Sequence, residues 1–312
     1  MLDVTLCGVQ FQNPLVLASG ILGLTGAGMY RVIESGAGAV TMKSVSEQER
    51  PGHPNPTMVG NQTYFLNAVG LSNPGIEEAK KEIEHFKQLS HAPLIGSIFA
   101  GTRDGFVRLA EHIDEMPIDL LEVNLSCPNV GQEFAEPFAY SKEAVKQITK
   151  DIKEKTKKPI SIKLSPNVWN IAELAKAAEA AGADAITAVN TVSGMAIDVR
   201  ARRPILHNTH GGVSGPALFP IALKCVYDMY EAVKIPIIGT GGVTTGEDAL
   251  AMIMAGATLV GVGSAVYYRG EDCFQKITNE IKDTMNSEGI KNLDEIRGIA
   301  HETMNNKQIT IR

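Results

Sequence analysis

Eight short apolar runs recur along the chain, and most neighbouring runs are separated by a segment with the periodicity of an amphipathic helix. Strands that alternate with helices predict parallel βαβ units. Eight regular units favour an α/β fold of the closed (β/α)8 TIM barrel type, and an open doubly wound sheet is the alternative. The predicted strands span residues 15–18, 39–42, 94–98, 119–125, 160–164, 185–190, 236–240 and 258–262. The predicted helices span residues 27–35, 76–89, 105–115, 142–157, 171–181, 218–233 and 247–255.

The connections from predicted helices to predicted strands repeat one pattern. Segments 34–39, 179–184 and 254–258 each carry a glycine at the end of a helix and then step into a strand. Glycine is expected there because it accepts the left-handed conformation that ends many helices. This weak internal repeat agrees with a barrel.

The segments outside these units predict the rest of the architecture. Residues 4–11 predict a short N-terminal hairpin at the bottom of the barrel. Segments 47–66 and 193–215 are rich in Gly, Pro and Asn and follow strands, so they predict long loops on the catalytic face. Since no linker or low-complexity segment interrupts the chain, we expect residues 1–312 to form a single domain.

Composition excludes several classes of protein. Hydrophobic residues make up 44% of the 312 residues and charged residues 21%, which suits a packed soluble core. The net charge of −6 and the lack of a long basic run argue against nucleic-acid binding. No apolar stretch approaches the ~20 residues of a membrane span, and the N-terminus does not resemble a signal peptide. We therefore expect a cytoplasmic protein with no membrane partner.

The cysteines exclude two kinds of metal centre within this chain. Cys7, Cys127, Cys225 and Cys273 form no C-x-x-C pair, so neither a structural zinc site nor an iron–sulfur cluster is predicted. The predicted strand ends also lack a cluster of Asp, Glu and His, which disfavours a metal hydrolase. We expect no metal site.

Two glycine-rich segments near the C-terminus, 235–243 and 254–264, predict a phosphate site. Each is a short apolar strand that ends in glycines, and a predicted helix lies between them. In a (β/α)8 barrel the loops after the seventh and eighth strands commonly hold a phosphate. Glycine lets backbone N–H groups approach phosphate oxygens, and a helix N-terminus adds favourable partial charge. The chain is therefore expected to bind a phosphorylated ligand.

Polar residues at the other predicted strand ends have two interpretations each. Lys43 and Lys163 end apolar strands, so they either reach solvent or a carboxylate, or supply positive charge to a ligand or cofactor. Cys127 in segment 124–129 is either a small buried residue or a base or nucleophile at the barrel rim. Asn67 in segment 67–75 is either part of a turn or a ligand-binding amide.

With these residues in place, the chain closely resembles the class 1 dihydroorotate dehydrogenases. The resemblance spans nearly the whole chain and rests on segments 13–20, 41–44, 67–75, 122–129, 162–166 and 190–191 and on the two glycine loops. The family implies a barrel that binds FMN and oxidises dihydroorotate to orotate in pyrimidine biosynthesis. Class 2 enzymes carry serine as the base, so Cys127 places the chain in class 1.

The resemblance also implies residue roles. Cys127 would be the catalytic base, and FMN N5 would accept the hydride. The implied substrate-binding residues are Lys43, Asn67, Ala68, Val69, Gly70, Leu71, Asn124, Asn129, Asn190 and Thr191. The implied FMN-binding residues are Ser19, Gly20, Lys43, Ser44, Asn124, Lys163, Gly215, Gly241, Gly242, Gly263 and Ser264. One departure is Ser97, where the family often has asparagine, and its role is left open.

Segments 194–198, 202–204 and 211–215 resemble subclass 1B. Those enzymes work with an electron-transfer subunit that carries FAD and a 2Fe–2S cluster and passes electrons to NAD+. The resemblance therefore implies a homodimer at the core of a heterotetramer. It leaves the physiological electron acceptor and the oligomeric state to be measured.

Two rival functions remain at this point. One is another cysteine-dependent FMN barrel that acts on a dihydropyrimidine or on dihydrouridine. The acidic balance disfavours a tRNA substrate, and Lys43 with Asn67 disfavours an uncharged pyrimidine. The other is a non-catalytic phosphate-binding barrel, which leaves Cys127 between two asparagines unexplained.

Overall fold

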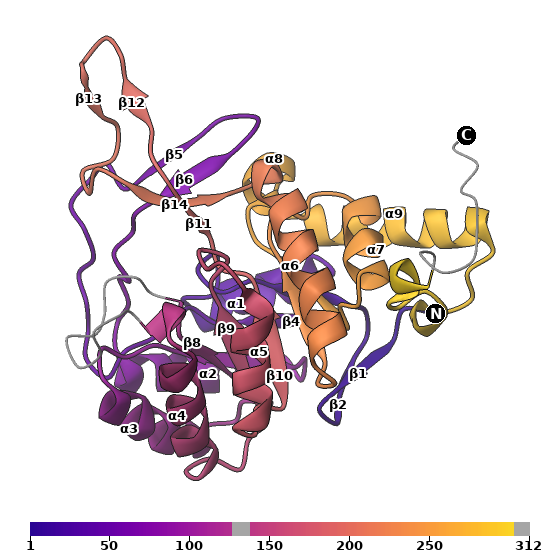
Figure 1. Cartoon of the computed structure of the whole chain (residues 1–312), viewed down its shortest axis with the longest axis horizontal. Helices are drawn as coiled ribbons and strands as arrows, with labels where there is room; N and C mark the ends of the chain where they lie inside the picture. The colour runs from indigo at the N-terminus through magenta and orange to yellow at the C-terminus, as the bar shows by residue number, and fades with distance from the viewer. Residues whose placement is uncertain (127–137, 303–312) are drawn as a thin grey trace.

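The computed structural model describes residues 1–126 and 138–302, and eight parallel strands form a closed barrel within them (Figure 1). The strands are β3 (Leu15–Leu17), β4 (Ala39–Thr41), β7 (Leu94–Ile98), β8 (Leu120–Asn124), β9 (Ile160–Leu164), β10 (Ala185–Ala188), β15 (Ile237–Thr240) and β16 (Leu259–Val262). Closure occurs where β3 pairs with both β16 and β4. The predicted barrel is confirmed, and the open sheet is excluded because the strand order has no free edge.

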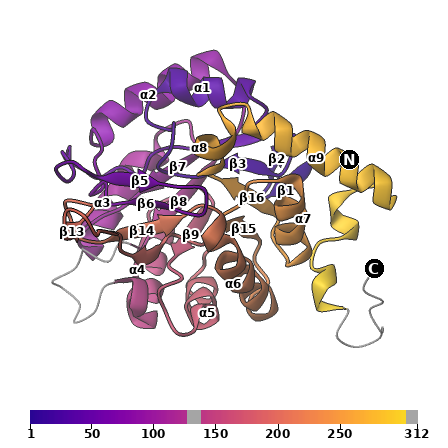
Figure 2. The same ribbon diagram turned by 90° about the horizontal axis from the view of Figure 1, so that it is seen from above.

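Helices surround the barrel, as the view from above shows (Figure 2). The ring is made by α1 (Gly26–Glu34), α2 (Ile76–Leu89), α3 (Arg103–Asp114), α4 (Lys142–Lys153), α5 (Ile171–Ala180), α6 (Phe219–Ala232) and α7 (Gly246–Met254). In α4, Ala144, Val145, Ile148 and Ile152 are buried, which is the stripe that a helix needs to cover a sheet. The Ser141 hydroxyl accepts a hydrogen bond from the Ala144 N–H and begins this helix.

The repeated glycine connections have the expected conformation. Gly36, Gly182 and Gly256 have φ values of 99°, 96° and 117°, a region that other residues rarely enter. Each follows a helix of the ring and leads into the next barrel strand. The internal repeat seen in the sequence therefore corresponds to a repeated backbone turn.

The N-terminal hairpin is also confirmed. Strand β1 (Val4–Leu6) pairs with β2 (Val9–Phe11), and Leu6 and Phe11 are buried in the core. The Cys7 thiol donates to the carbonyl oxygen of Asp184, which immediately precedes β10. This contact places the hairpin at the N-terminal ends of the barrel strands.

The two long loops contain more structure than the sequence predicted. They supply β5 (Met58–Gly60), β6 (Phe65–Asn67), β11 (Val192–Gly194) and β14 (Gly211–Ser214), which form an antiparallel sheet in the order β11-β14-β6-β5. Strand β6 pairs with β14, so the two loops meet across the mouth of the barrel. Strands β12 (Ile197–Asp198) and β13 (Arg203–Pro204) form a hairpin that projects beyond this sheet (Figure 1).

The helices after the eighth barrel strand were not predicted. Here α8 (Ala265–Arg269) leads into α9 (Cys273–Glu288), which packs against α7. Phe274, Ile277, Ile281 and Met285 are buried and recur at helical spacing. This spacing is typical of an amphipathic helix, so α9 could have been predicted from the sequence.

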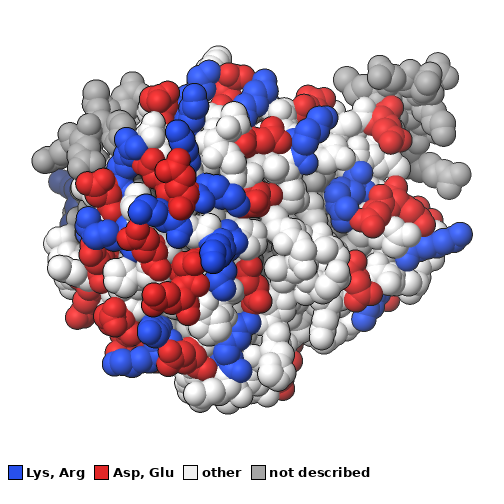
Figure 3. All heavy atoms as spheres, turned by 90° about the horizontal axis from the view of Figure 1, so that it is seen from below, with Lys and Arg blue, Asp and Glu red and all other residues white. Residues whose placement is uncertain are grey.

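The surface of the barrel carries both signs of charge. Figure 3 shows the face opposite to that of Figure 2, where basic and acidic side chains are interspersed. Elsewhere on the helices, oppositely charged side chains form ion pairs such as Lys142–Glu173 and Lys155–Glu111. Among the described residues, no helix has the length and apolar character needed to span a membrane.

The glycine turns allow a matched test of the fold. A Cβ at Gly256 would lie 2.1 Å from Tyr230 Cγ, whereas at Gly182 the nearest contact is Lys153 Cγ at 3.4 Å. Gly182→Ala should therefore cost about 1–3 kcal/mol of backbone strain. Gly256→Ala should cost roughly 1–3 kcal/mol more, because the ring must move. Denaturant unfolding of both variants measures the difference, and equal losses would contradict this packing.

Candidate functional site

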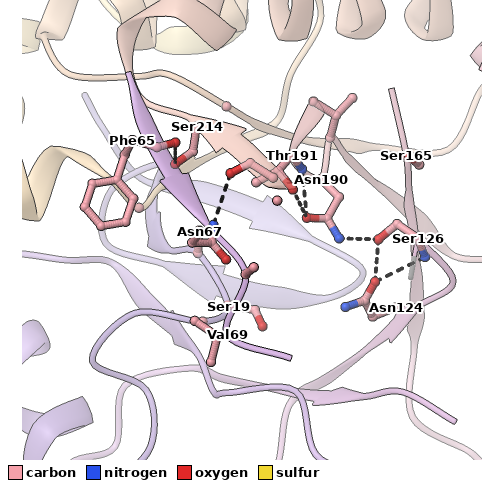
Figure 4. A pocket seen from close by; sticks show the side chains of 18 of the residues that line it. Ser19, Phe65, Asn67, Val69, Asn124, Ser126, Ser165, Asn190, Thr191 and Ser214 are labelled. Carbon is pink, nitrogen blue, oxygen red and sulfur yellow. Dashed lines mark hydrogen bonds between the residues drawn. The ribbon is translucent and has the colours of Figure 1, made fainter. Parts of the chain in front are cut away.

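A cavity of about 400 Å³ opens at the mouth of the barrel, between the C-terminal ends of the strands and the four-stranded sheet (Figure 4). Its volume lies in the range of small-molecule sites. The structure brings most of the expected site residues together in its lining. These are Ser19, Gly20, Lys43, Ser44, Asn67, Ala68, Val69, Gly70, Leu71, Asn124, Lys163, Asn190, Thr191, Gly241, Gly242, Gly263 and Ser264.

Three of the expected site residues are not among these lining residues. Cys127 and Asn129 lie outside the described residues. Gly215 does not line the cavity, although its neighbour Ser214 does. Gly215 is buried, with a φ of 84°, and a Cβ there would lie 2.7 Å from the Tyr268 hydroxyl.

One wall of the cavity is a cluster of amides joined by a hydroxyl (Figure 4). The Ser126 hydroxyl donates to Asn124 Oδ1 and accepts from Asn190 Nδ2. The Thr191 N–H donates to Asn190 Oδ1 at 2.8 Å, which fixes the orientation of that amide. The cluster thus presents uncharged donors and acceptors, the groups needed to bind the amides of a planar ring.

The sheet over the mouth holds Asn67 opposite this cluster. Asn67 is paired with Gly212, and its Nδ2 donates to the Gly212 carbonyl at 3.4 Å. A Cβ at Gly212 would lie 2.1 Å from Thr191 Oγ1, so only glycine permits this close approach. Asn67 is therefore part of a strand that faces the cavity and is not simply part of a turn.

The sequence reasoning missed several polar residues of the lining. Asn167 donates from Nδ2 to the Thr191 carbonyl at 2.9 Å and accepts from the Ser193 N–H at 2.8 Å. It thereby ties the loop after β9 to the start of β11. Ser126 and Asn167 both lie in polar segments directly after barrel strands, which is the pattern that could have found them.

The two lysines differ in their surroundings. Lys43 is half-buried and lines the cavity. Lys163 is buried, with its Nζ 3.3 Å from Glu122 Oε1. Of the two interpretations, pairing with a carboxylate is observed for Lys163, and the side chain also lines the cavity, as a role toward a ligand requires.

Glycines build the other end of the cavity. Gly241 and Gly242 have φ values of 136° and 73°, and a Cβ at Gly242 would lie 2.4 Å from the Phe219 N. Gly263 and Ser264 face them from the end of β16. These residues fit a phosphate group, because the backbone is exposed without side chains in the way.

The N-terminus of α7 contributes less to this end than the sequence suggested. The Asp248 carboxylate accepts from the N–H groups of Thr244 and Thr245, and Glu280 of α9 accepts from the Gly246 N–H at 2.7 Å. Arg269 donates to Glu280 and to the Thr244 carbonyl. The N–H groups of residues 244–246, at the entry to α7, are therefore already used by carboxylates, which leaves the glycine loops as the candidate phosphate site.

One buried hydroxyl close to these loops has no hydrogen-bond partner among the described residues. Tyr268 Oη is inaccessible to solvent and has no hydrogen-bond partner within the described residues. It lies beside Gly215 on the helix that follows Gly263 and Ser264. Tyr268 is not among the residues that line the cavity, so this hydroxyl lies behind the glycine loops.

Known proteins identify the family of this barrel. The family model described as dihydroorotate dehydrogenase matches residues 1–285. The chain belongs to the dihydroorotate dehydrogenase family. It is 44% identical over 305 residues to a protein of Methanocaldococcus jannaschii named dihydroorotate dehydrogenase B (NAD(+)), catalytic subunit, covering 97% of this chain and 99% of the relative. It is 44% identical to the protein of the same name from Pyrococcus abyssi, covering 96% and 99% of the two chains. The resemblance found in the sequence, subclass included, is confirmed.

The three described cysteines are poor nucleophiles. A reagent that modifies thiolates can therefore test whether Cys127 is the reactive thiol of the chain. Burial raises the pKa of the Cys7, Cys225 and Cys273 thiols to about 11. At pH 8 about one in a thousand of these thiols is ionised, against about a quarter for a thiol with the ordinary pKa of ~8.5. Iodoacetamide at pH 8 should therefore label Cys127 first, as measured by peptide mass mapping.

Cys225→Ser is the control for this labelling experiment and should leave the rate unchanged. Comparable labelling of Cys7 or Cys273 would contradict the raised pKa of these thiols.

Proposed function

We propose that this chain oxidises dihydroorotate to orotate with FMN, in the synthesis of pyrimidines. One observation carries the proposal: a single cavity has an uncharged amide cluster at one end and side-chain-free glycine loops at the other. A planar ring fits the first end and a cofactor phosphate fits the second. The names of the relatives, which are dihydroorotate dehydrogenases, support the same activity.

The reaction removes a proton from C5 of dihydroorotate and a hydride from C6. Bound FMN supplies the acceptor for the hydride. Cys127 in its thiolate form takes the proton, which makes the reaction faster as pH rises until the thiol is ionised. Asn67, Asn124 and Asn190 bind the ring amides, with Thr191 assisting and Asn129 completing the set.

Charged groups then distinguish the substrate from other pyrimidines. Lys43 pairs with the carboxylate that dihydroorotate carries and uracil lacks. Lys163, which lines the cavity, would stabilise negative charge on the reduced cofactor. Ser19, Gly20 and Ser44 lie beside Lys43 and contact the cofactor, and the backbone of residues 68–71 contacts the substrate.

The rival functions are weighed against the same cavity. An uncharged dihydropyrimidine or dihydrouridine carries no carboxylate, whereas a cation, Lys43, lines the cavity. A non-catalytic phosphate-binding barrel has no use for the amide cluster joined by Ser126. Dihydroorotate is therefore the substrate that accounts for both features.

The decisive experiment is spectroscopic. The purified chain should bind FMN noncovalently, and anaerobic dihydroorotate should bleach its absorbance. Cys127→Ser should still bind FMN but be reduced about 10²–10⁴-fold more slowly near neutral pH, since a hydroxyl is a much weaker acid than a thiol. Protein that stays colourless with added FMN would refute the cofactor. Near-normal reduction of the variant would refute the base.

Lys43→Ala tests substrate choice. A charge-assisted contact to a carboxylate is stronger than a neutral hydrogen bond. The dissociation constant for orotate should therefore rise at least tenfold more than that for uracil, as measured by titration of the flavin spectrum. Equal increases in the two dissociation constants would show that Lys43 does not bind the carboxylate.

We also propose that this chain works as the catalytic subunit of a larger assembly. A second protein with FAD and a 2Fe–2S cluster would receive the electrons and pass them to NAD+, with two copies of this chain at the core of a heterotetramer. The names of the relatives support a partner, since each is called a catalytic subunit. The hairpin of β12 and β13 offers a surface, because Ile197 and Val199 are 58% and 81% exposed.

The isolated chain should reduce an artificial acceptor or oxygen but scarcely reduce NAD+. Stopped-flow reoxidation of the dihydroorotate-reduced protein measures this directly. Fast NAD+ reduction by the homogeneous chain would refute the partner, and efficient use of fumarate would indicate subclass 1A instead.

A further inference from the structure

A chain of hydrogen bonds runs behind the cavity wall and crosses five neighbouring strands of the barrel. Ser19 follows β3, Ser44 follows β4, and Ser97, Glu122 and Lys163 lie on β7, β8 and β9. The successive distances between side-chain atoms are 2.9, 2.8, 3.0 and 3.3 Å. The hydrogen bonds thus connect the Ser19 hydroxyl to the Lys163 ammonium without a break.

Its two ends face the cavity and its middle does not. Ser19, Ser44 and Lys163 line the cavity, whereas Ser97 and Glu122 lie behind it. Ser97 is fully buried, and Glu122 is 3% exposed. A carboxylate and an ammonium buried together cost so much desolvation that an apolar pair of similar volume is often at least as stable. Stability alone therefore does not explain this buried pair, and the contact of Glu122 with the lining residue Lys163 points to a role at the cavity.

The direction of every hydrogen bond in this chain follows from Glu122. As the carboxylate of an ion pair it only accepts, and its Oε1 receives both Ser97 Oγ and Lys163 Nζ. Each serine has one hydroxyl hydrogen. The hydrogen of Ser97 is used on Glu122, so Ser44 must donate to Ser97, and Ser19 must donate to Ser44. Ser19 therefore presents only oxygen lone pairs to the cavity.

We propose that Glu122 and Ser97 are positioning residues that set the polarity of this wall. Glu122 holds the Lys163 ammonium at the cavity and, through Ser97, points the hydroxyls of Ser44 and Ser19 away from the ligand. The bound ligand then meets a cationic donor at one end of the wall and a hydroxyl acceptor at the other. This inference rests on the proposed function, with FMN as the ligand.

The charge of Glu122 also opposes the charge of Lys163 at the cofactor. Reduction adds negative charge to the flavin, and the Lys163 cation stabilises it. A carboxylate beside that lysine weakens the effect through its own field. Glu122 therefore keeps the flavin easier to reoxidise than Lys163 alone would, which suits a protein that must pass its electrons on.

Glu122→Gln tests the charge while keeping a side chain of the same shape. The preference of the protein for reduced over oxidised FMN should rise on the order of tenfold. That change corresponds to an increase of about 30 mV in the two-electron reduction potential. Equilibrium reduction against a reference dye measures it without turnover. A ratio that is unchanged or lower, in a variant that binds FMN, overturns the charge role.

Ser97→Ala tests the hydroxyl chain while keeping the ion pair. Ser44 loses its fixed acceptor, so the Ser44 and Ser19 hydroxyls can turn toward the ligand. The dissociation constant for FMN should rise several-fold, while the preference for the reduced form stays within about twofold. Ser161→Ala is the matched control, because Ser161 is fully buried on β9, bonds to Thr187 at 2.8 Å and does not line the cavity.

The outcomes separate this inference from the proposed function. Wild-type protein that binds no FMN overturns both. Wild-type protein that binds FMN, with Ser97→Ala no weaker than Ser161→Ala, overturns the hydroxyl chain alone. If Glu122→Gln does not fold, the comparison of Ser97→Ala with Ser161→Ala still decides whether the hydroxyl chain sets the polarity of the wall.

Discussion

Closure of the barrel is the constraint on which the rest of the structure depends. In each strand alternate side chains face the interior, and all eight strands run in one direction, so their C-terminal ends meet at one mouth. Glu122 and Asn124 on β8 face inward with Ser161 and Lys163 on β9, because the register sets Glu122 beside Ser161 and Asn124 beside Lys163. Residues far apart in the sequence thereby become one polar layer.

The elements of the barrel could be predicted from the sequence, and the contacts of the site only in part. The apolar runs gave the strand positions within one or two residues, since a strand covered on both faces is continuously hydrophobic. The sequence also indicated that Lys163 needed a partner. That this partner is Glu122 depends on strand order and register, which no local pattern contains. Helix α9 was also predictable, because Phe274, Ile277 and Ile281 recur at helical spacing.

The sheet over the mouth is a stronger case of the same limit. Segments 47–66 and 193–215 resemble loops because Gly, Pro and Asn dominate them, and neither is a strand by itself. Each loop forms its own antiparallel pair, β5 with β6 and β11 with β14, and the two pairs join through β6 and β14, over a separation of 145 residues between Asn67 and Gly212. Gly212 marks the point where two backbones approach closely. The position of Asn67 over the cavity is thus a long-range property.

The two ends of the cavity are built on different physical principles. At the end with the amide cluster, side chains line the cavity, and each is oriented by a neighbour such as Ser126. At the end with the glycine loops, backbone lines the cavity, and the loops must be held from outside. Arg269 and Glu280 do this by bonding to Thr244 and Gly246. Helix α9 lines no part of the cavity described here, but through Glu280 it holds the segment that follows the glycine loop.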